Sequence, residues 1–409
     1  MYESIKENGY FLGSNFKKSD TGFFPFFPLV WRWLNASPIS ISILNFSLFF
    51  IGFHWLIREF QTPKNIQRIV LSIPSIIFFI VPYTESFFFI SSTMMLIGWK
   101  NKRHLLVIAG IIIASISRPS FLYFLPALLF CFIFYWKNNL IDKNIKRIIY
   151  STLIGLSVGF ILQLIIFKIM TGNAFVFFQN RQSNNSFALP AFPLTTWRGS
   201  KLLWLDGIAL LVTLTTALTC LYYLVRSFNK LNLNINIHDN NSWAPTNQRI
   251  DTQIKKSVNS EPSKSFNKKT PLNFIILFST GYVSVILVHI LFFNIKDPSG
   301  PTSLLGLNRF VFTSPFFFLL VQHHWPTNYN EKQIKICFIL ILTLCLILLG
   351  AFAFSRYPEQ LRPMLYIMFT SLFWIYRHRW KNLWIGFYFF HIILQVICFN
   401  NFISGLWVG

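Results

Sequence analysis

Long apolar runs separated by short polar segments make up most of this chain. The runs cover residues 38–57, 69–83, 86–99, 104–117, 119–136, 148–170, 202–225, 272–293, 310–322, 335–354, 361–376 and 383–399. Apolar runs of about 15–24 residues are typical of helices that cross a bilayer with a hydrocarbon core of roughly 30 Å. The pattern therefore predicts an all-α polytopic membrane protein with about 12 transmembrane segments.

Some of these runs are too short to cross the bilayer as one straight helix. A helix of about fifteen residues spans less than the hydrocarbon core. We therefore expect 69–99 and 104–136 to form two tight hairpins of short or tilted helices. Residues 23–34, rich in Phe and Trp, predict a helix that lies in the membrane interface.

Lysines and arginines collect in alternate loops between the apolar runs. By the positive-inside rule, such loops face the cytoplasm. The loops concerned are 58–68, 100–103, 137–147, 227–271, 332–335 and 377–381. Strict alternation places the other connections on the external or lumenal face, namely 1–22, 82–85, 117–119, 171–201, 294–309, 355–360 and the C-terminus.

A long polar stretch divides the chain into three parts. Residues 227–271, rich in Lys, Asn and Ser, lack apolar periodicity and predict a disordered cytoplasmic insert. Before it lies an N-terminal membrane region, 1–226, whose external loops carry most of the candidate site residues. After it lies a C-terminal membrane region, 272–409.

Composition supports the membrane class and argues against several others. Hydrophobic residues make up 54% of the 409 residues and charged residues 12%, against roughly 25% charged residues in soluble domains. The net charge of +23 lies mainly in the loops, as membrane orientation requires, so no nucleic-acid partner is expected. The five cysteines lack a CxxC pair, the histidines lack zinc-type spacing, and glycine-rich nucleotide motifs are absent. We therefore expect no protein-ligated metal and no cofactor.

Two charged residues interrupt apolar sequence on the predicted external face. Glu85 lies in "FIVPYTESFFFI" and Arg118 in "ASISRPSFLYFL". An unpaired charge among apolar residues is costly, so two interpretations stay open: a structural ion pair between them, or a shared ligand site. Arginine favours phosphate because its planar fork donates bidentate hydrogen bonds. Further phosphate-binding candidates on the same predicted face are Arg181, Arg198 and Arg309.

Several stretches, taken in order, point to one family. They are "YESIKENGY", "GFFPFFPLV", "LNFSLFFI", "PYTESFFF", "SRPSFLYFLPALL", "WRGS" and "NRFVFTSPFFF". This series resembles the PIG-V family, GPI mannosyltransferase 2 and its bacterial relatives, within the GT-C superfamily of polytopic glycosyltransferases. The resemblance covers nearly the whole chain except 227–271, and the closing "FISGLWVG" is similar to the ending of bacterial members.

The resemblance implies a GT-C-like helical bundle that transfers a sugar, typically mannose, from a polyprenyl- or dolichyl-phosphate sugar. The implied acceptor is a glycolipid or glycan on the external or lumenal face, as in GPI-anchor biosynthesis. The lipid-linked sugar is a substrate and not a cofactor, and a role for a divalent metal is left open. Such a transfer needs a carboxylate near the acceptor hydroxyl and cations beside the departing phosphate. By resemblance, Glu85 matches the family's acid, and Arg118 and Arg309 match its arginines.

One family feature is missing. The first external loop of the family begins with Trp-Asp, whose Asp is regarded as the catalytic acid. Counted back from Gly9, that Asp falls before Met1, and the family's first transmembrane helix is absent as well. We expect either further coding sequence upstream of Met1 or a chain that has lost this acid, with Glu3 and Glu7 as the available substitutes.

Two other functions stay open. The missing Asp is consistent with a catalytically silent relative that acts as an accessory subunit. A lipid or small-molecule transporter is expected to show inverted repeats and ionisable residues at mid-span, whereas the charges here gather at the ends of apolar runs. The expected location is the bacterial plasma membrane, or the endoplasmic reticulum membrane if the organism is a eukaryote.

Overall fold

Helices form nearly all of the described structure. The computed structural model describes residues 2–11, 20–187, 189–190, 205–228, 270–295, 303–304, 306–324, 330–333, 335–336, 338–340, 343, 365–370, 372–373 and 383–404. The elements up to residue 187 are α1 (Tyr2–Asn8), η2 (Asp20–Gly22), α2 (Phe26–Leu34), α3 (Pro38–Phe60), α4 (Lys64–Ser72), η3 (Pro74–Phe79), α5 (Glu85–Lys100), α6 (His104–Ser117), α7 (Phe121–Lys137), α8 (Lys143–Thr171), α9 (Val176–Asn184) and β1 (Asn185–Phe187). The later elements are α10 (Leu205–Phe228), α12 (Thr270–Phe292), β2 (Phe293–Ile295), α13 (Leu307–Phe312), α14 (Pro315–His324) and α17 (Leu383–Ile403).

Five of the described helices are long and apolar enough to cross a membrane. They are Pro38–Phe60, Lys143–Thr171, Leu205–Phe228, Asn273–Phe292 and Ile385–Ile403, and α6 and α7 are shorter apolar helices. Helices suit a bilayer because they satisfy their backbone hydrogen bonds internally. The prediction of an all-α polytopic membrane protein is confirmed. The number of about 12 spans stays a prediction, since 344–364 and 374–382 lie outside the described residues.

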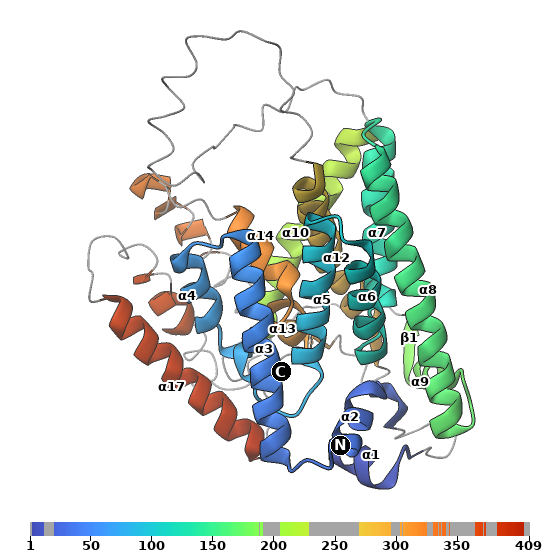
Figure 1. Cartoon of the computed structure of the whole chain (residues 1–409). Coiled ribbons are helices and arrows are strands. Elements are labelled where there is room, and N and C mark those ends of the chain that lie inside the picture. The colour runs from blue at the N-terminus through green and yellow to red at the C-terminus, as the bar shows by residue number, and fades with distance from the viewer. Residues whose placement is uncertain are drawn as a thin grey trace.

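Helix α5 lies inside the bundle, among α3, α6, α12 and α14 (Figure 1). Thirteen of its 16 residues are buried. A helix buried on all sides is expected to be apolar or small all round, and α5 combines Phe and Leu with Ser and Thr. Its first residue, Glu85, is therefore placed in the protein interior and not at the lipid surface.

Close contacts between helices depend on glycine. A Cβ at Gly110 of α6 would lie 2.5 Å from the Ser91 backbone oxygen of α5. A Cβ at Gly159 of α8 would lie 2.7 Å from the Ser115 Cβ of α6. Small residues are favoured at such contacts because van der Waals packing drives helix association in membranes. These glycines hold α6 between α5 and α8, which determines where Arg118, at the end of α6, lies.

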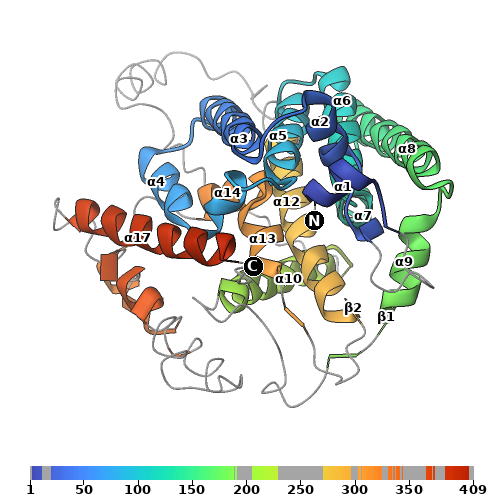
Figure 2. The same cartoon turned by 90° about the horizontal axis from the view of Figure 1, so that it is seen from below.

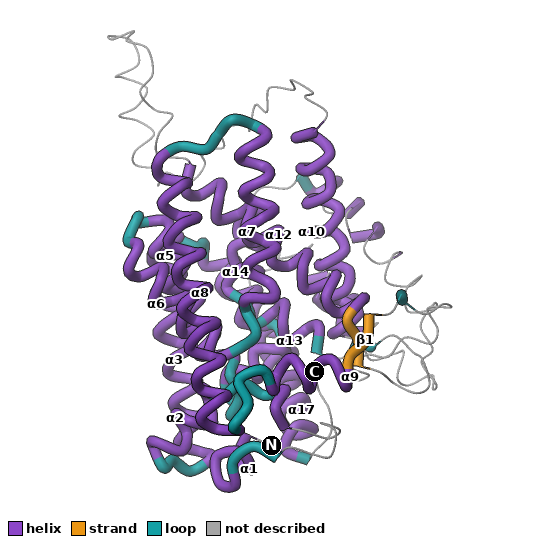
Figure 3. Tube along the Cα trace, turned by 90° about the vertical axis from the view of Figure 1, so that its right-hand side faces the viewer, coloured by secondary structure: helices purple, strands orange, loops and turns teal. Residues whose placement is uncertain are grey.

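The short elements α1, α2 and α9 lie together at one end of the bundle (Figures 1 and 2). The helix predicted within 23–34 is present as α2, whose Phe27 and Trp31 are buried with Tyr2 of α1. Its position in the membrane interface stays a prediction. Strands β1 and β2 pair antiparallel next to α9 (Figure 3). Seen from this end, α17 and α8 lie on opposite sides of the molecule (Figure 2).

Prolines interrupt two of the predicted spans. The prediction of one short or tilted helix over 69–83 is wrong, because α4 ends at Ser72 and the 3-10 helix η3 begins at Pro74. Proline has no N–H with which to continue α-helical hydrogen bonding. The run 310–322 is likewise divided between α13 and α14, and α14 begins at Pro315.

The predicted division into three parts is not tested by the structure. Residues 229–269 of the insert lie outside the described residues. The boundaries 1–226, 227–271 and 272–409 therefore stay a prediction.

Candidate functional site

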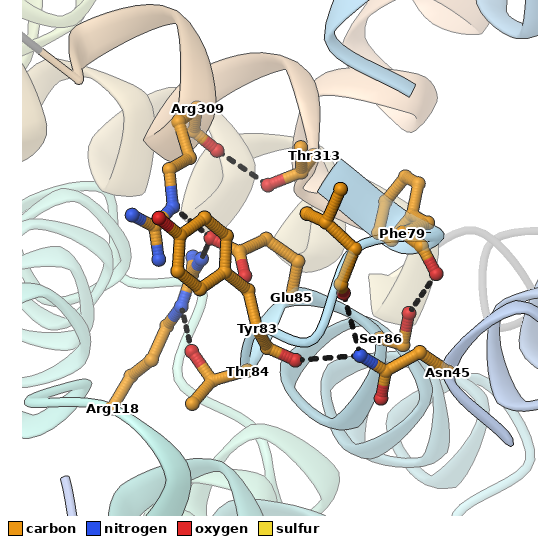
Figure 4. Close-up of polar contacts among 10 residues, drawn as sticks. Asn45, Phe79, Tyr83, Thr84, Glu85, Ser86, Arg118, Arg309 and Thr313 are labelled. Atoms are coloured by element: carbon orange, nitrogen blue, oxygen red, sulfur yellow. Dashed lines mark hydrogen bonds and ion pairs between the residues drawn. The ribbon is translucent and has the colours of Figure 1, made fainter. Parts of the chain in front are cut away.

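The turn before α5 places Glu85 at the first residue of that helix. A carboxylate is favoured there by the partial positive charge of the helix N-terminus. The turn is held from α3 by Asn45, whose Nδ2 donates to the Val81 carbonyl at 2.8 Å and to the Tyr83 carbonyl at 3.0 Å (Figure 4). Ser86 also donates to the Phe79 carbonyl, at 3.0 Å.

Arg118 reaches Glu85 from the end of α6. It precedes Pro119, and a residue before proline is restricted to extended backbone; its φ of −148° and ψ of 161° fit this restriction. The helix therefore ends, and the side chain turns to α5. Its Nε donates to Thr84 Oγ1 at 3.2 Å, and its Nη2 donates to Glu85 Oε1.

Arg309 approaches the same carboxylate from α13 (Figure 4). This helix follows Gly306, whose φ of +86° favours glycine. Arg309 Nε donates to Glu85 Oε1, the oxygen that also accepts from Arg118. We call Glu85, Arg118 and Arg309 the ion triad.

The ion triad is buried and carries excess positive charge. The side-chain exposures are 0% for Glu85, 6% for Arg118 and 14% for Arg309. Two guanidinium groups against one carboxylate leave a net charge of +1. A buried excess charge is unfavourable unless another group compensates it. The triad is thus suited to bind an anion.

Two fully buried polar atoms of the triad have no hydrogen-bond partner in the described structure: Glu85 Oε2 and Arg118 Nη1. Buried polar groups are normally paired, so such atoms require an explanation. One is an acceptor and the other a charged donor, and a ligand that offers both a hydroxyl and an anionic oxygen satisfies both.

Aromatic rings surround the two arginines. The Arg118 guanidinium lies 5.1 Å from the Phe88 ring centre and 5.3 Å from that of Phe310. The Arg309 guanidinium lies 4.2 Å from the Tyr83 ring centre. Such cation–π contacts stabilise a cation without neutralising it. The rings therefore leave the charge of the triad available.

Tyr2 of α1 borders the triad, although it was not among the predicted site residues. It is buried, its ring lies 5.9 Å from that of Tyr83, and its hydroxyl interacts with Thr84. Burial raises the pKa of this hydroxyl to about 12, so it is a neutral donor near pH 7. No sequence signal distinguished Tyr2 from the other tyrosines.

A second buried carboxylate, Asp206, was also missed. Its Oδ1 accepts from the Asn308 backbone N at 3.0 Å and from Asn308 Nδ2 at 2.7 Å. Ser75 of the η3 segment donates to Asn308 Oδ1 at 2.9 Å. The network fixes α13 against α10 and η3 directly before Arg309. An Asp in the first turn of an apolar helix, "LDGIALL", was the available signal.

The other predicted residues lie elsewhere. Arg181 contacts His289 of α12, as described below. Glu3 and Glu7 are exposed on α1, whereas their neighbour Tyr2 is buried. Arg198 lies outside the described residues. Within the described part of the chain, no group of three His, Cys, Asp or Glu side chains is arranged to hold a metal ion.

No known family model, curated protein or solved structure matches this chain. The class that fold and site define is a polytopic α-helical membrane protein with a buried, net-positive ion triad.

Proposed function

We propose that this protein is an integral membrane glycosyltransferase of the GT-C type. It transfers a hexose, expected to be mannose, from a polyprenyl- or dolichyl-phosphate sugar to a glycolipid or glycan acceptor. The proposal rests on the resemblance to the PIG-V family and on one structural observation. Glu85, Arg118 and Arg309, the residues matched by that resemblance, meet in one buried cluster with a net charge of +1.

The chemistry needs a place for a departing phosphate. The acceptor hydroxyl oxygen attacks the anomeric carbon, the bond from that carbon to the phosphate oxygen breaks, and the electron pair leaves with the lipid phosphate. Cations aimed at the leaving oxygen stabilise the charge that develops on it. Arg118 Nη1 is a buried donor without another partner in the described structure and suits this task.

The acceptor hydroxyl must also be oriented and lose its proton. Glu85 Oε2 is an acceptor that neither arginine uses. In this proposal it accepts the hydrogen bond of the attacking hydroxyl and takes the proton as the new carbon–oxygen bond forms. Tyr2, neutral and close to Thr84, is a hydrogen-bond donor at the edge of the same cluster.

A second candidate function is a catalytically silent subunit that binds a lipid phosphate. The observation that favours it is the composition of the cluster. Among the described residues, Glu85 is the one carboxylate in contact with the two arginines, and both contacts fall on the same oxygen. Such a subunit binds the donor lipid without transferring the sugar.

Membranes from cells that express the chain test the proposal through incorporation of labelled mannose from polyprenyl-phosphate-mannose. We expect Arg118→Gln and Arg309→Gln to lower incorporation on the order of 10²-fold, the scale of losing one preorganised charge contact. Arg32→Gln is the matched control, since Arg32 is an exposed arginine on α2 and is expected to be dispensable. Donor binding without incorporation in the unaltered chain supports the silent subunit. Undiminished incorporation in both triad variants overturns the assignment.

A further inference from the structure

A second cationic cluster lies between α9 and α12. Arg181 Nη1 and His289 Nε2 are 2.7 Å apart. A guanidinium group only donates hydrogen bonds, so His289 Nε2 is the acceptor and the ring is neutral, with its proton on Nδ1. The Arg181 guanidinium also lies 5.4 Å from the Phe177 ring centre and interacts with Tyr123.

The charge of Arg181 is not compensated in the described structure. It forms no ion pair with a carboxylate among the described residues, and its polar partners, His289 and Tyr123, are uncharged. The side chain is half-buried, so its charge is only partly stabilised by water. His289 thus positions the guanidinium and leaves its charge available. Of its five N–H donors, enough remain for a bidentate contact with an anion.

This cluster is separated from the ion triad by two aromatic rings. Arg118 packs on the Phe310 ring, the Phe310 and Tyr123 ring centres are 6.2 Å apart, and those of Tyr123 and His289 are 5.3 Å apart. Phe310 and Tyr123 thus connect the two clusters, which have no arginine in common. The two arginine clusters are therefore neighbouring but distinct.

We propose that Arg181 and His289 form a second anion-binding subsite that takes the phosphate of a lipid headgroup. Its interpretation as the acceptor subsite rests on the proposed function: the triad holds the donor phosphate and this cluster the phosphate of the acceptor lipid. The binding of a phosphate at Arg181 does not itself depend on sugar transfer. A free phosphate offers the same chemistry, and the experiment separates the two sources.

The test measures binding to the full-length protein in nanodiscs of zwitterionic lipid. The probes are dihexanoyl phosphatidylglycerol, which carries one anionic phosphodiester, and inorganic phosphate. Arg181→Gln is expected to weaken phosphatidylglycerol binding about 10- to 100-fold, the value of a lost charged hydrogen-bond contact. Arg32→Gln, which removes an exposed arginine of α2, is expected to bind like the unaltered chain.

His289→Glu gives a second, independent readout. It places a carboxylate against Arg181, compensates the charge, and is expected to weaken binding by a similar factor. Arg181→Lys keeps the charge but loses the planar fork, so its phosphatidylglycerol binding is expected to lie between that of the unaltered chain and that of Arg181→Gln. These two variants keep the test decisive if Arg181→Gln does not fold. Weakened phosphate binding with unchanged phosphatidylglycerol binding overturns the headgroup assignment. Unchanged binding of both probes in Arg181→Gln or His289→Glu overturns the subsite.

The result of this binding test does not depend on the result of the mannose-transfer assay. If the unaltered chain transfers no mannose but Arg181→Gln still loses phosphatidylglycerol binding, the subsite stands and the proposed function fails. If transfer is found and Arg181→Gln changes neither binding nor the KM for the acceptor lipid, the subsite fails and the proposed function stands.

Discussion

Replacing the carboxylate of the ion triad tests what holds the two arginines in place. Glu85→Gln keeps the shape of the side chain but removes its charge, which leaves two buried guanidinium groups with no counter-charge. Removing one partner of a buried ion pair costs about 3–5 kcal/mol. Glu85 is fully buried and contacts both arginines, so we expect a cost within this range.

The net charge of the triad predicts an asymmetry between its members. Arg118→Met leaves Glu85 paired with Arg309 and a net charge of zero, so we expect a smaller cost of about 1–3 kcal/mol, from the lost contacts with Thr84 and the aromatic rings. The double variant retains only Arg309. Its cost is expected to fall short of the sum of the single costs by about 1–3 kcal/mol.

Unfolding free energies in mixed micelles titrated with SDS, followed by tryptophan fluorescence, measure these costs. Glu331→Gln is the control, because the Lys335–Glu331 pair at 3.4 Å is more than half exposed on both sides. Exposed pairs contribute about 0–1 kcal/mol. If Glu85→Gln costs no more than this control, or if the single costs simply add, the carboxylate does not hold the arginines and the reasoning is refuted.

Three further predictions concern orientation, packing and pH. A cysteine replacing Ser183 should react with an impermeant thiol reagent on intact cells, whereas one within 227–271 should react only after the membrane is opened; the opposite pattern contradicts the predicted topology. Gly110→Ala should destabilise the bundle by about 1–3 kcal/mol in the SDS titration, because the added Cβ meets backbone atoms of α5. Gly386→Ala is the control and should not destabilise it, because nothing lies within 4 Å of a Cβ at that position. Equal stability of the two variants argues against the close helix contact. Burial raises the pKa of Tyr2 to about 12, so the folded protein holds this hydroxyl proton more tightly than the unfolded chain does. The neutral Tyr2 hydroxyl therefore contributes fully to the free energy of unfolding below pH 10, and this contribution is lost as the pH rises through 12. The melting temperature should therefore fall more steeply between pH 10 and 12 in the unaltered chain than in Tyr2→Phe, and parallel curves rule out this contribution.

The helical membrane class was predictable because the bilayer restricts what a spanning segment can be. Apolar runs of sufficient length have almost no alternative to helix, and α3, α8 and α12 follow the predicted runs closely. The failure over 69–83 has an equally local cause. Hydropathy does not register the missing N–H of Pro74, so a run that reads as one span contains a break.

The candidate site was predictable in part. Glu85 and Arg118 were predicted as site residues because they are charged residues within apolar sequence on one predicted face. The structure places them in contact. Arg309 lies 224 positions after Glu85 and binds the same carboxylate oxygen. This contact depends on how α13 packs, and no local sequence pattern encodes that packing. Asp206 was overlooked because one acid at the start of the apolar helix α10 barely changes the hydropathy of that helix. Its hydrogen bonds to Asn308 nevertheless hold α13 in position.

The three members of the triad share a local cause for their positions. Glu85 begins a helix after a proline-containing turn, Arg118 ends one before Pro119, and Arg309 follows Gly306 in a short helix that stops before Pro315. In each case a proline or glycine ends regular helix close to a charge. Because a charge in mid-span is costly, such breaks are where a membrane protein can place arginine and glutamate in its interior. The residues that shorten the helices therefore also create the site.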